Sequence, residues 1–333
     1  MGPKPLHSAV ISGVGSYVPD RVLTNADLEK MVDTNDEWIV SRTGIRERRI
    51  LEEGKATSDM AVEAGKRALE MARVKPEDVG LVIVGTFTPD YVFPATACLV
   101  QDRLGLSKAA AYDVNAACSG FIFSLITACQ FVFTGAYEHV LVIGADTNSR
   151  IMDWQDRGTC VIFGDAASAV VVSRSDSGRG LLSSYMRTDG SGWKHLHMPA
   201  GGSKLPPNLD TVRERMHYIK MEGKETFRFA ARAMTEAATE VTRRAGLTAE
   251  DIRLVVPHQA NIRIIQAACS RLGFGEEKVV VNIDRFGNTV AASVGLALAE
   301  VYQTGRVKTD DNILIVGFGA GLTWGGAIIR WGP

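Results

Sequence analysis

The feature that most constrains this chain is an internal repeat within its 333 residues. Three short motifs occur twice in the same order: PEDV at 76–79 and AEDI at 249–252, RLGL at 103–106 and RLGF at 271–274, and TG before an apolar run at 134–135 and 304–305. The offsets fall between 168 and 173 residues. A solenoid repeats every ~20–50 residues, so this longer spacing indicates two duplicated domains.

Apolar runs alternate with amphipathic patterns along the chain. We expect buried strands at 79–86, 109–114 and 140–144, each bounded by turn-forming residues. A helix is expected over 57–73, with Ser58 as its N-cap. This alternation predicts an α/β fold.

The boundary between the repeated units lies in a turn-like segment, SDSGRG, at 175–180. The predicted N-terminal half is therefore 1–178, and the predicted C-terminal half is 179–333. A stretch rich in Gly, Pro and His at 189–208 is expected to form an irregular insertion after the first strand of the second half.

The composition excludes several classes of function. A net charge of -1 and a pI near 6.6 give no overall field for binding nucleic acid or an anionic membrane, so any acidic partner must bind a local basic patch. The five cysteines form no CxxC pair, and the first ten residues lack the pattern of a signal peptide. The longest apolar stretch, at 118–133, is too short and too interrupted to span a bilayer. We therefore expect a cytoplasmic protein without nucleic-acid or membrane partners.

Cys118 is the first candidate for chemistry, because it lies in a small-residue turn between an expected strand and an apolar helix. The partial positive charge of a helix N-terminus lowers the pKa of a thiol, so we expect a nucleophilic thiolate. A shift of about 170 residues places Asn288 at the start of the matching helix, so both helix N-termini should face a shared centre. We interpret the other cysteines as small buried hydrophobic residues: Cys98, Cys129, Cys160 and Cys269.

His258 is the second candidate. It follows the run LVVP, which places the imidazole at the C-terminal edge of a parallel sheet, where α/β folds build their sites. The alternative is a structural histidine. Asn288 alone would be an ordinary N-cap, and its correspondence with Cys118 is what favours a catalytic role. The glycine-rich segment GFGAG at 317–321 can bring backbone N–H groups against a substrate oxyanion.

Two other kinds of site are poorly supported. His195 and His197 form an HxH pair, but no cysteine or carboxylate stands at metal-site spacing, so we expect no metal there. The GxG strings at 13–15 and 317–319 lack a full GxGxxG with an acidic residue about 20 positions on, which argues against a dehydrogenase.

Six motifs then carry a resemblance over about 9–331: DEWIVSRTGIRERR at 36–49, DVNAACSGF at 113–121, GDAASAV at 164–170, PHQANIRI at 257–264, GNTVAAS at 287–293 and GFGAGLTWG at 317–325. In this order they resemble the β-ketoacyl-acyl carrier protein synthase III family of condensing enzymes. The resemblance implies a thiolase-like fold, in which two βαβαβαββ halves form five layers, α-β-α-β-α. It also implies Cys118, His258 and Asn288 as the catalytic triad.

Related families fit less well. Degradative thiolases need a second catalytic cysteine in the C-terminal glycine loop, and GFGAG has none. Elongating condensing enzymes use two histidines, and hydroxymethylglutaryl-CoA synthases use a glutamate. Chalcone-synthase-like enzymes share the triad but are typically longer and lack the motif DEWIVSRTGI.

The same resemblance implies roles for further residues. Coenzyme A would bind to Trp38 and Arg157, which sandwich its adenine, and to Arg42, which contacts its phosphates. The acyl pocket would include Met221, Gly223, Phe227 and a residue that reaches into the pocket of a partner subunit, Phe93. An acidic carrier protein would dock on Arg228, Arg263 and Arg271.

The oxyanion loop would be Gly319, Ala320 and Gly321. Ala320 replaces a glycine of the family pattern and is tolerated if its φ is negative. The remaining arginines of the 42–49 run are expected on a solvated face: Arg46, Arg48 and Arg49.

The resemblance implies condensation of a short acyl-CoA, acetyl-CoA first, with malonyl-acyl carrier protein by a ping-pong mechanism that initiates fatty acid synthesis. It implies a homodimer and no cofactor, coenzyme A being part of the substrate. The nearest alternative is a condensing or acyl-transfer enzyme of secondary metabolism, with the same triad and another primer or carrier. A catalytically silent acyl-CoA-binding protein is a further alternative, which the presence of all three polar residues disfavours.

Overall fold

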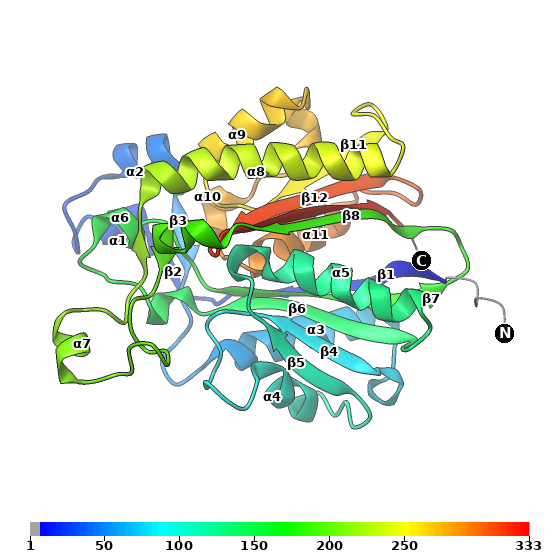
Figure 1. Ribbon diagram of the computed structural model, residues 1–333, viewed down its shortest axis with the longest axis horizontal. Helices are drawn as coiled ribbons and strands as arrows, with labels where there is room; N and C mark the ends of the chain where they lie inside the picture. Colours follow the sequence, from blue (N-terminus) through cyan, green and yellow to red (C-terminus); the bar gives the residue numbers. More distant parts are fainter. Residues whose placement is uncertain (1–6, 333) are drawn as a thin grey trace.

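Two β-sheets face each other across a central helical layer, and further helices cover their outer faces (Figure 1). This computed structural model describes residues 7–332. The first six residues, on which the expectation about a signal peptide partly rested, lie outside the described range. The layers follow the order α-β-α-β-α, so the predicted five-layered fold is confirmed.

The first sheet has five strands, in the spatial order β1 (Ser8–Tyr17), β7 (Ala166–Ser175), β6 (His139–Asp146), β4 (Leu81–Gly85) and β5 (Ala110–Val114). β4 runs parallel to both β5 and β6, while β7 is antiparallel to its neighbours. The run LVIVG of β4 is buried throughout, as expected for a central strand covered on both faces.

The second sheet repeats this order with four strands, β8 (Gly180–Thr188), β13 (Thr323–Arg330), β12 (Asn312–Gly319) and β11 (Ile252–Pro257). The position equivalent to β5 holds only an isolated parallel bridge between Val255 and Val279. The second half therefore follows the βαβαβαββ plan with one strand reduced to a single pairing. The first sheet ends at Ser175 and the second begins at Gly180.

Two helices fill the central layer, α5 (Gly120–Phe133) and α11 (Ala292–Gln303). The first sheet is covered on its outer face by α3 (Thr57–Ala72) and α4 (Thr96–Arg103), and the second by α8 (Gly223–Arg244) and α9 (Ile262–Arg271). α5 is apolar around most of its circumference because sheets cover both sides of it. Within residues 7–332, no helix has the length and apolar character needed to cross a bilayer.

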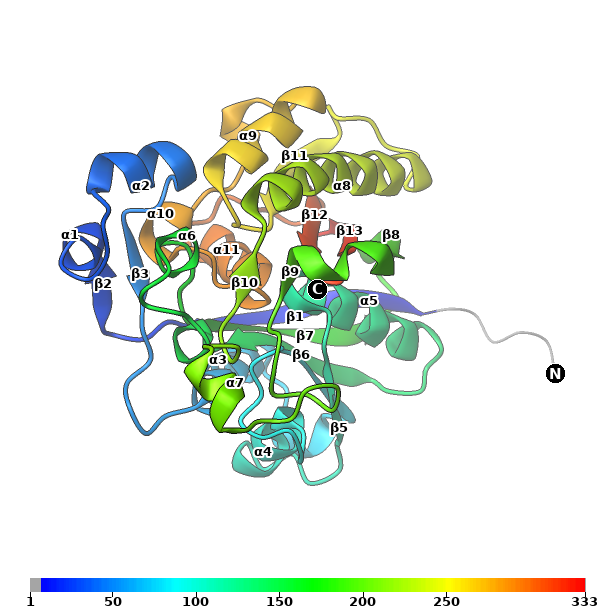
Figure 2. The same cartoon turned by 60° about the vertical axis from the view of Figure 1, so that its left-hand side comes forward.

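Two segments outside the sheets line one end of the molecule (Figure 2). Between β1 and α3 lie β2 (Val22–Thr24), α1 (Asn25–Leu28), α2 (Asp36–Thr43) and β3 (Glu47–Arg49). After β8 come β9 (Leu196–His197), α7 (Leu209–Arg213) and β10 (Lys220–Met221), so the predicted insertion is irregular apart from short elements. Two further short helices are α6 (Arg157–Cys160) and α10 (Ile283–Phe286).

Three local predictions need correction. Ser58 is not the N-cap of α3, since the helix begins at Thr57 and the side chain of Asp59 accepts the backbone N–H of Ala56. Arg48 does not lie on a solvated face: it is fully buried and donates hydrogen bonds to the carbonyls of Leu23 and Val161. Cys98 is exposed, whereas the other four cysteines are buried, and all five are free.

The register of the sheets gives the correspondence between the two halves. β4 pairs Leu81 with Val140, and β11 pairs Leu254 with Ile313, so each member of one pair precedes its counterpart by 173 residues. The same offset relates Ala117 and Val290, which both have left-handed backbone angles, with φ of 46° and 51°. The counterpart of Cys118 is therefore Ala291. The predicted correspondence between Cys118 and Asn288 is wrong by three residues.

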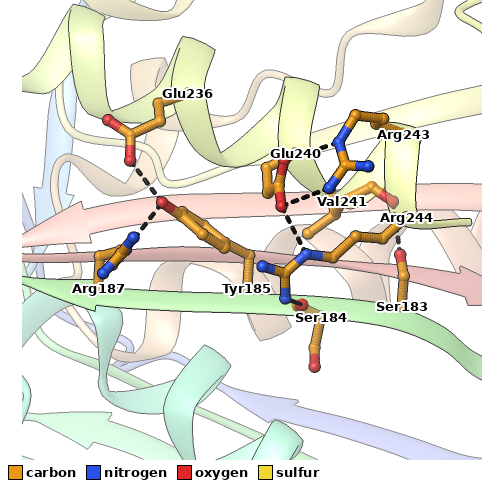
Figure 3. A network of polar contacts seen from close by, with 9 residues as sticks. All are labelled: Ser183, Ser184, Tyr185, Arg187, Glu236, Glu240, Val241, Arg243 and Arg244. Atoms are coloured by element: carbon orange, nitrogen blue, oxygen red, sulfur yellow. Dashed lines mark hydrogen bonds and ion pairs between the residues drawn. The ribbon is translucent and has the colours of Figure 1, made fainter.

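A polar network joins α8 to the second sheet (Figure 3). The hydroxyl of Tyr185 on β8 donates to Glu236 Oε1 at 2.6 Å and accepts from Arg187 Nε at 3.0 Å. Trp324 Nε1 donates to the same carboxylate oxygen at 3.2 Å. These bonds fasten the middle of the helix whose first turns border the cavity described below.

A Tyr185→Phe variant is expected to lose about 1 kcal/mol of the free energy of unfolding, because the ring still packs while the hydroxyl no longer bridges Glu236 and Arg187. Urea denaturation measures this loss. Tyr302→Phe, at a half-exposed ring on α11, is the control and should change the free energy by less than half as much. Equal losses in the two variants would contradict the contribution of the network.

Candidate active site

Cys118 lies in a tight turn, Ala117–Ser119, between the end of β5 and the start of α5. The turn needs the left-handed backbone of Ala117, which aims the next residue at the space between the two halves. Cys118 is 5% exposed, and its side chain borders two cavities. A nucleophile placed there can meet substrates from one side and hold an acyl group on the other.

His258 directly follows β11, as predicted, and its backbone N–H donates to Val316 in the neighbouring strand. Nδ1 lies 2.6 Å from the hydroxyl of Ser293, and the ring stands edge-on to Phe318 at a centroid distance of 5.3 Å. Nε2 is buried and has no hydrogen-bond partner among residues 7–332. Burial lowers the pKa of the imidazole to about 3, so the ring is neutral in the free site.

The Ser293 hydroxyl can hold either neutral tautomer of His258. A hydroxyl both donates and accepts, so Nε2 is an acceptor when Nδ1–H donates to Ser293 and a donor when Ser293 donates to Nδ1. The backbone N–H of Gln259 approaches the same hydroxyl at 3.4 Å and helps to keep it in place.

Asn288 does not lie at the start of a helix, which corrects the prediction. It stands four residues before α11, in a loop whose backbone bridges to Phe163 in parallel fashion. Its Oδ1 accepts the backbone N–H of Val290 at 2.9 Å. The amide NH2 is thus the group that this side chain can offer to the cavity it lines.

The glycine-rich loop closes over Cys118 from the second half. Gly319 packs so tightly against the turn that a Cβ there would lie 2.7 Å from the backbone nitrogen of Cys118. Thr323 Oγ1 donates to the carbonyl of Ala116 at 3.1 Å and ties the loop to the turn. Ala320 has no positive φ, so the condition for tolerating alanine there is met. The backbone N–H groups of Cys118 and Ala320 both face the thiol.

The thiol is not a preformed thiolate, which corrects a second prediction. Burial is the largest influence and raises the pKa of Cys118 to about 12, with a further rise from the nearby carboxylate of Asp146. The N–H groups of Cys118 and Ala320 lower it by less. Nucleophilic attack from this site therefore requires a proton acceptor, and the unpartnered Nε2 of His258 lines the same cavity.

Two cavities meet at Cys118. The larger, of about 280 Å³, forms a tunnel from Trp38 and Arg42 at the surface to the three candidate catalytic side chains. The smaller, of about 90 Å³, is an apolar chamber, lined by residues that include Phe87, Ile151, Leu196, Ile219 and Val290. The arrangement suits a long substrate arm that delivers an acyl group to Cys118, and an acyl chain that occupies the chamber.

Comparisons with known proteins agree with this geometry. Family models described as 3-oxoacyl-[acyl-carrier-protein (ACP)] synthase III and its C-terminal part match residues 112–190 and 242–331. A β-ketoacyl-[acyl-carrier-protein] synthase III from Caldanaerobacter subterraneus subsp. tengcongensis is 57% identical, over 97% of this chain and 98% of that protein. The chain belongs to the 3-oxoacyl-[acyl-carrier-protein] synthase III family. It is therefore an acyltransferase, a condensing enzyme of fatty acid synthesis.

Solved structures of similar proteins share the fold. The 3-oxoacyl-[acyl-carrier-protein] synthase III of Aquifex aeolicus VF5 is 47% identical, with a TM-score of 0.91 over 97% of this chain and 100% of that one. A priming β-ketosynthase from the R1128 polyketide biosynthetic pathway is 36% identical, with a TM-score of 0.91 over 99% of each chain. These likenesses confirm the predicted thiolase-like fold.

The residues expected to bind coenzyme A meet at the outer end of the tunnel. The guanidinium carbon of Arg157 lies 5.0 Å from the centre of the Trp38 ring, and Arg42 lines the tunnel beside them. A base sandwiched between two flat groups needs a separation of roughly 7 Å, which is two van der Waals contacts. Arg157 must therefore move outwards before an adenine can stack between it and Trp38.

The residues predicted for the acyl pocket lie in two different places. Met221, Gly223 and Phe227 line the tunnel and not the chamber beyond Cys118. Phe93 is 84% exposed and lines neither cavity of its own chain.

Sequence reasoning missed the residues that do line the chamber. Phe87 could have been found, because it follows the C-terminal end of a parallel strand, and Val290 because it is two residues from Asn288. Ile151 and Ile219 are joined by a backbone hydrogen bond across 68 positions and carry no local signal.

The three predicted docking arginines do share one surface. Arg228, Arg263 and Arg271 line a broad groove outside the tunnel mouth, together with Arg42 and Arg232. Arg228 also pairs with Glu225 at 3.1 Å, so part of its charge is matched within the chain.

Nothing in residues 7–332 resembles a metal centre, since no group of three or more histidine, cysteine or acidic side chains gathers there. The two histidines of the HxH pair make hydrogen bonds within the chain. His195 Nδ1 lies 2.7 Å from Glu222 Oε2, and His197 Nδ1 lies 3.0 Å from the carbonyl of Lys194.

A Ser293→Ala variant is expected to slow the condensation about tenfold, because His258 loses the group that orients its ring and tautomer. A quenched assay of the condensation measures the effect. Ser124→Ala is the matched control, since Ser124 is a buried helical serine whose hydroxyl has no partner among the described residues. An equal loss of rate in both variants would contradict the role of Ser293 in orienting His258.

Proposed function

We propose that the enzyme joins a short acyl-CoA primer, acetyl-CoA first, to malonyl-acyl carrier protein and so initiates fatty acid synthesis. The observation that carries this proposal is the convergence of Cys118, the Nε2 of His258 and Asn288 on one buried tunnel. A nucleophile and two polar groups that line the same tunnel are what a two-step acyl transfer with carbanion formation requires.

In the first half-reaction, Cys118 Sγ attacks the thioester carbonyl carbon of the acyl-CoA while His258 Nε2 accepts the thiol proton. The developing oxyanion is bound by the backbone N–H groups of Cys118 and Ala320, which already face the sulfur. The carbon–sulfur bond of coenzyme A then breaks, and its sulfur takes the proton from His258. The acyl group remains on Cys118.

In the second half-reaction, malonyl-acyl carrier protein occupies the same tunnel. Its carboxylate leaves as CO2, and the electron pair passes to the thioester as an enolate. Between the two half-reactions the neutral ring of His258 changes to the tautomer that carries its proton on Nε2, and Ser293 then donates to Nδ1. Nε2–H of His258 and the amide of Asn288 donate to the enolate oxygen, each contributing roughly 3–4 kcal/mol. The enolate carbon attacks the acyl group on Cys118, which releases the sulfur and gives 3-ketoacyl-acyl carrier protein.

The size of the chamber supports a short primer. An apolar cavity of about 150 Å³ holds one benzene molecule, so a chamber of about 90 Å³ suits an acyl chain of about four carbons or fewer. The enzyme itself needs no cofactor in this scheme, since coenzyme A enters and leaves as part of the substrate.

Electrostatics supports the carrier protein as the second partner. The whole chain has a net charge of -1, yet the groove at the tunnel mouth gathers Arg228, Arg263 and Arg271. A local basic surface of this kind attracts an acidic partner and orients its prosthetic arm towards the tunnel.

An exposed apolar loop supports a homodimer. Tyr91, Val92 and Phe93 are 61%, 92% and 84% exposed, beside the edge strand β5 of the first sheet. Exposed apolar clusters and unpaired sheet edges are features of subunit interfaces.

We place the enzyme in the cytoplasm, where its five free cysteines stay reduced.

An assay of acyl-CoA esters of increasing length with malonyl-acyl carrier protein tests the proposal. The expected product is 3-ketoacyl-acyl carrier protein, with acetyl-CoA among the best primers. A condensing enzyme of secondary metabolism is the second candidate, favoured by the 36% identity with the priming β-ketosynthase. Turnover only with longer primers, or only with a polyketide carrier protein, would favour that candidate and contradict ours.

A further inference from the structure

Asp146 is a buried acid that the reaction proposed above does not use. It is the last residue of β6, the strand that lies next to both central helices (Figure 1). Its side chain is 0% exposed and borders the space between the two halves. A buried carboxylate without a basic partner is costly, so its hydrogen bonds need an explanation.

The two oxygens of Asp146 bind opposite halves of the molecule. Oδ1 accepts from the backbone N–H of Phe87 at 3.0 Å, and also from the hydroxyls of Thr86 and Thr88 at 3.1 and 2.9 Å. Oδ2 accepts the backbone N–H of Ala291 at 3.0 Å. Burial raises the pKa of this carboxyl to about 7, and these donors oppose the rise. One carboxylate thus clamps a turn of the first half to a turn of the second.

The clamped turns carry functional groups. Phe87, from the first half, and Val290, from the second half, both line the acyl chamber. Val290 directly precedes Ala291, and its own N–H holds Oδ1 of Asn288. A short path of bonds therefore leads from Asp146 through Ala291 and Val290 to the amide of Asn288.

The internal repeat shows which residue takes the place of Asp146 in the second half of the chain. At the offset of 173 residues, Asp146 corresponds to Gly319, and Ala291 corresponds to Cys118. In the first half the side chain at this position accepts the N–H of the opposite turn. In the second half Gly319 has no side chain, and a Cβ there would lie 2.7 Å from the nitrogen of Cys118, so any side chain at this position would crowd that N–H.

We propose that Asp146 is a positioning residue which fills the counterpart of the oxyanion hole and, through the bond it makes there, holds Asn288 in place for decarboxylation. The duplicated fold thus has one open and one closed N–H site. The bond between Asp146 and Ala291 has a function of its own, because it fixes the turn that holds the amide of Asn288. This inference rests on the proposed function.

An Asp146→Asn variant tests the role with little change in volume. An amide has one acceptor oxygen for donors that come from two directions, so its NH2 must face either Phe87 or Ala291 and displace that turn. Decarboxylation of malonyl-acyl carrier protein is expected to fall tenfold or more, while acetyl loading on Cys118 stays within about threefold of the wild type. Both half-reactions are followed separately by mass spectrometry and CO2 release.

Asp165→Asn is the matched control. Asp165 is equally buried, accepts from Ser149 and Leu51, and lines neither cavity, so its substitution should lower the two half-reactions together or not at all. If Asp146→Asn does not fold, Thr86→Val against Thr86→Ser removes one donor to the carboxylate and should give a smaller loss of the same pattern. An equal loss in both half-reactions, or no loss in either, would overturn the role of Asp146. A wild-type enzyme that performs neither half-reaction would instead contradict the proposed function.

Discussion

A Cys118→Ala variant is expected to lose at least about 10⁴-fold in condensation, since Cys118 is the only cysteine among the described residues that line the tunnel. The same variant should still release CO2 from malonyl-acyl carrier protein. Decarboxylation depends on the two donors to the enolate, and alanine leaves both His258 and Asn288 in place. The measurement compares 3-ketoacyl product with CO2 in one reaction mixture.

The control for this variant is Cys129→Ala, because Cys129 is also buried and lies in the second half of α5, away from the site. It should lower stability slightly through a small cavity and leave condensation within a few-fold of the wild type. Loss of CO2 release in Cys118→Ala, with a folded protein, would contradict the separation of roles between the cysteine and the two donors.

An Asn288→Ala variant is expected to show the opposite pattern. Removing one donor to the enolate oxygen should slow decarboxylation and condensation by about 10²–10³-fold. Acetyl loading on Cys118 should change far less, because the N–H groups of Cys118 and Ala320 bind the oxyanion of that step. Single-turnover assays of each half-reaction separate the two effects.

The repeat supplies a matched control for this second variant. Asn115 stands at the offset of 173 residues from Asn288, in the equivalent turn of the first half, and it lines neither cavity. Asn115→Ala should leave both half-reactions nearly unchanged. If Asn115→Ala slowed decarboxylation as much as Asn288→Ala, turn stability and not the amide donor would be the cause.

Much of the fold could be predicted because its signals are local and repeated. The buried strands β4 and β6 are continuous apolar runs, and the recurrence of such runs at a constant spacing predicts duplicated halves. The positions of Cys118 and His258, at a turn and at a strand end, follow from the same pattern. The roles of Trp38 and the docking arginines came only from family resemblance.

The features that could not be predicted from the sequence depend on contacts between residues far apart in the chain. The chamber wall joins Ile151 to Ile219, and no local pattern indicates that pairing. The pKa of Cys118 depends on how completely two halves exclude water, which outweighs the helix N-terminus that alone suggested a thiolate. The place of Asn288 was misjudged because the repeat motifs vary in spacing, whereas the strand register does not.

The central claim is that Cys118 is the acyl carrier. Incubation of the enzyme with acetyl-CoA, followed by peptide mapping with mass spectrometry, tests it directly. The account predicts one acetyl group per chain, on the peptide that contains Cys118, and its disappearance when malonyl-acyl carrier protein is added. Acetylation of Cys98 or another residue in place of Cys118, or no acetylation at all, would contradict the account.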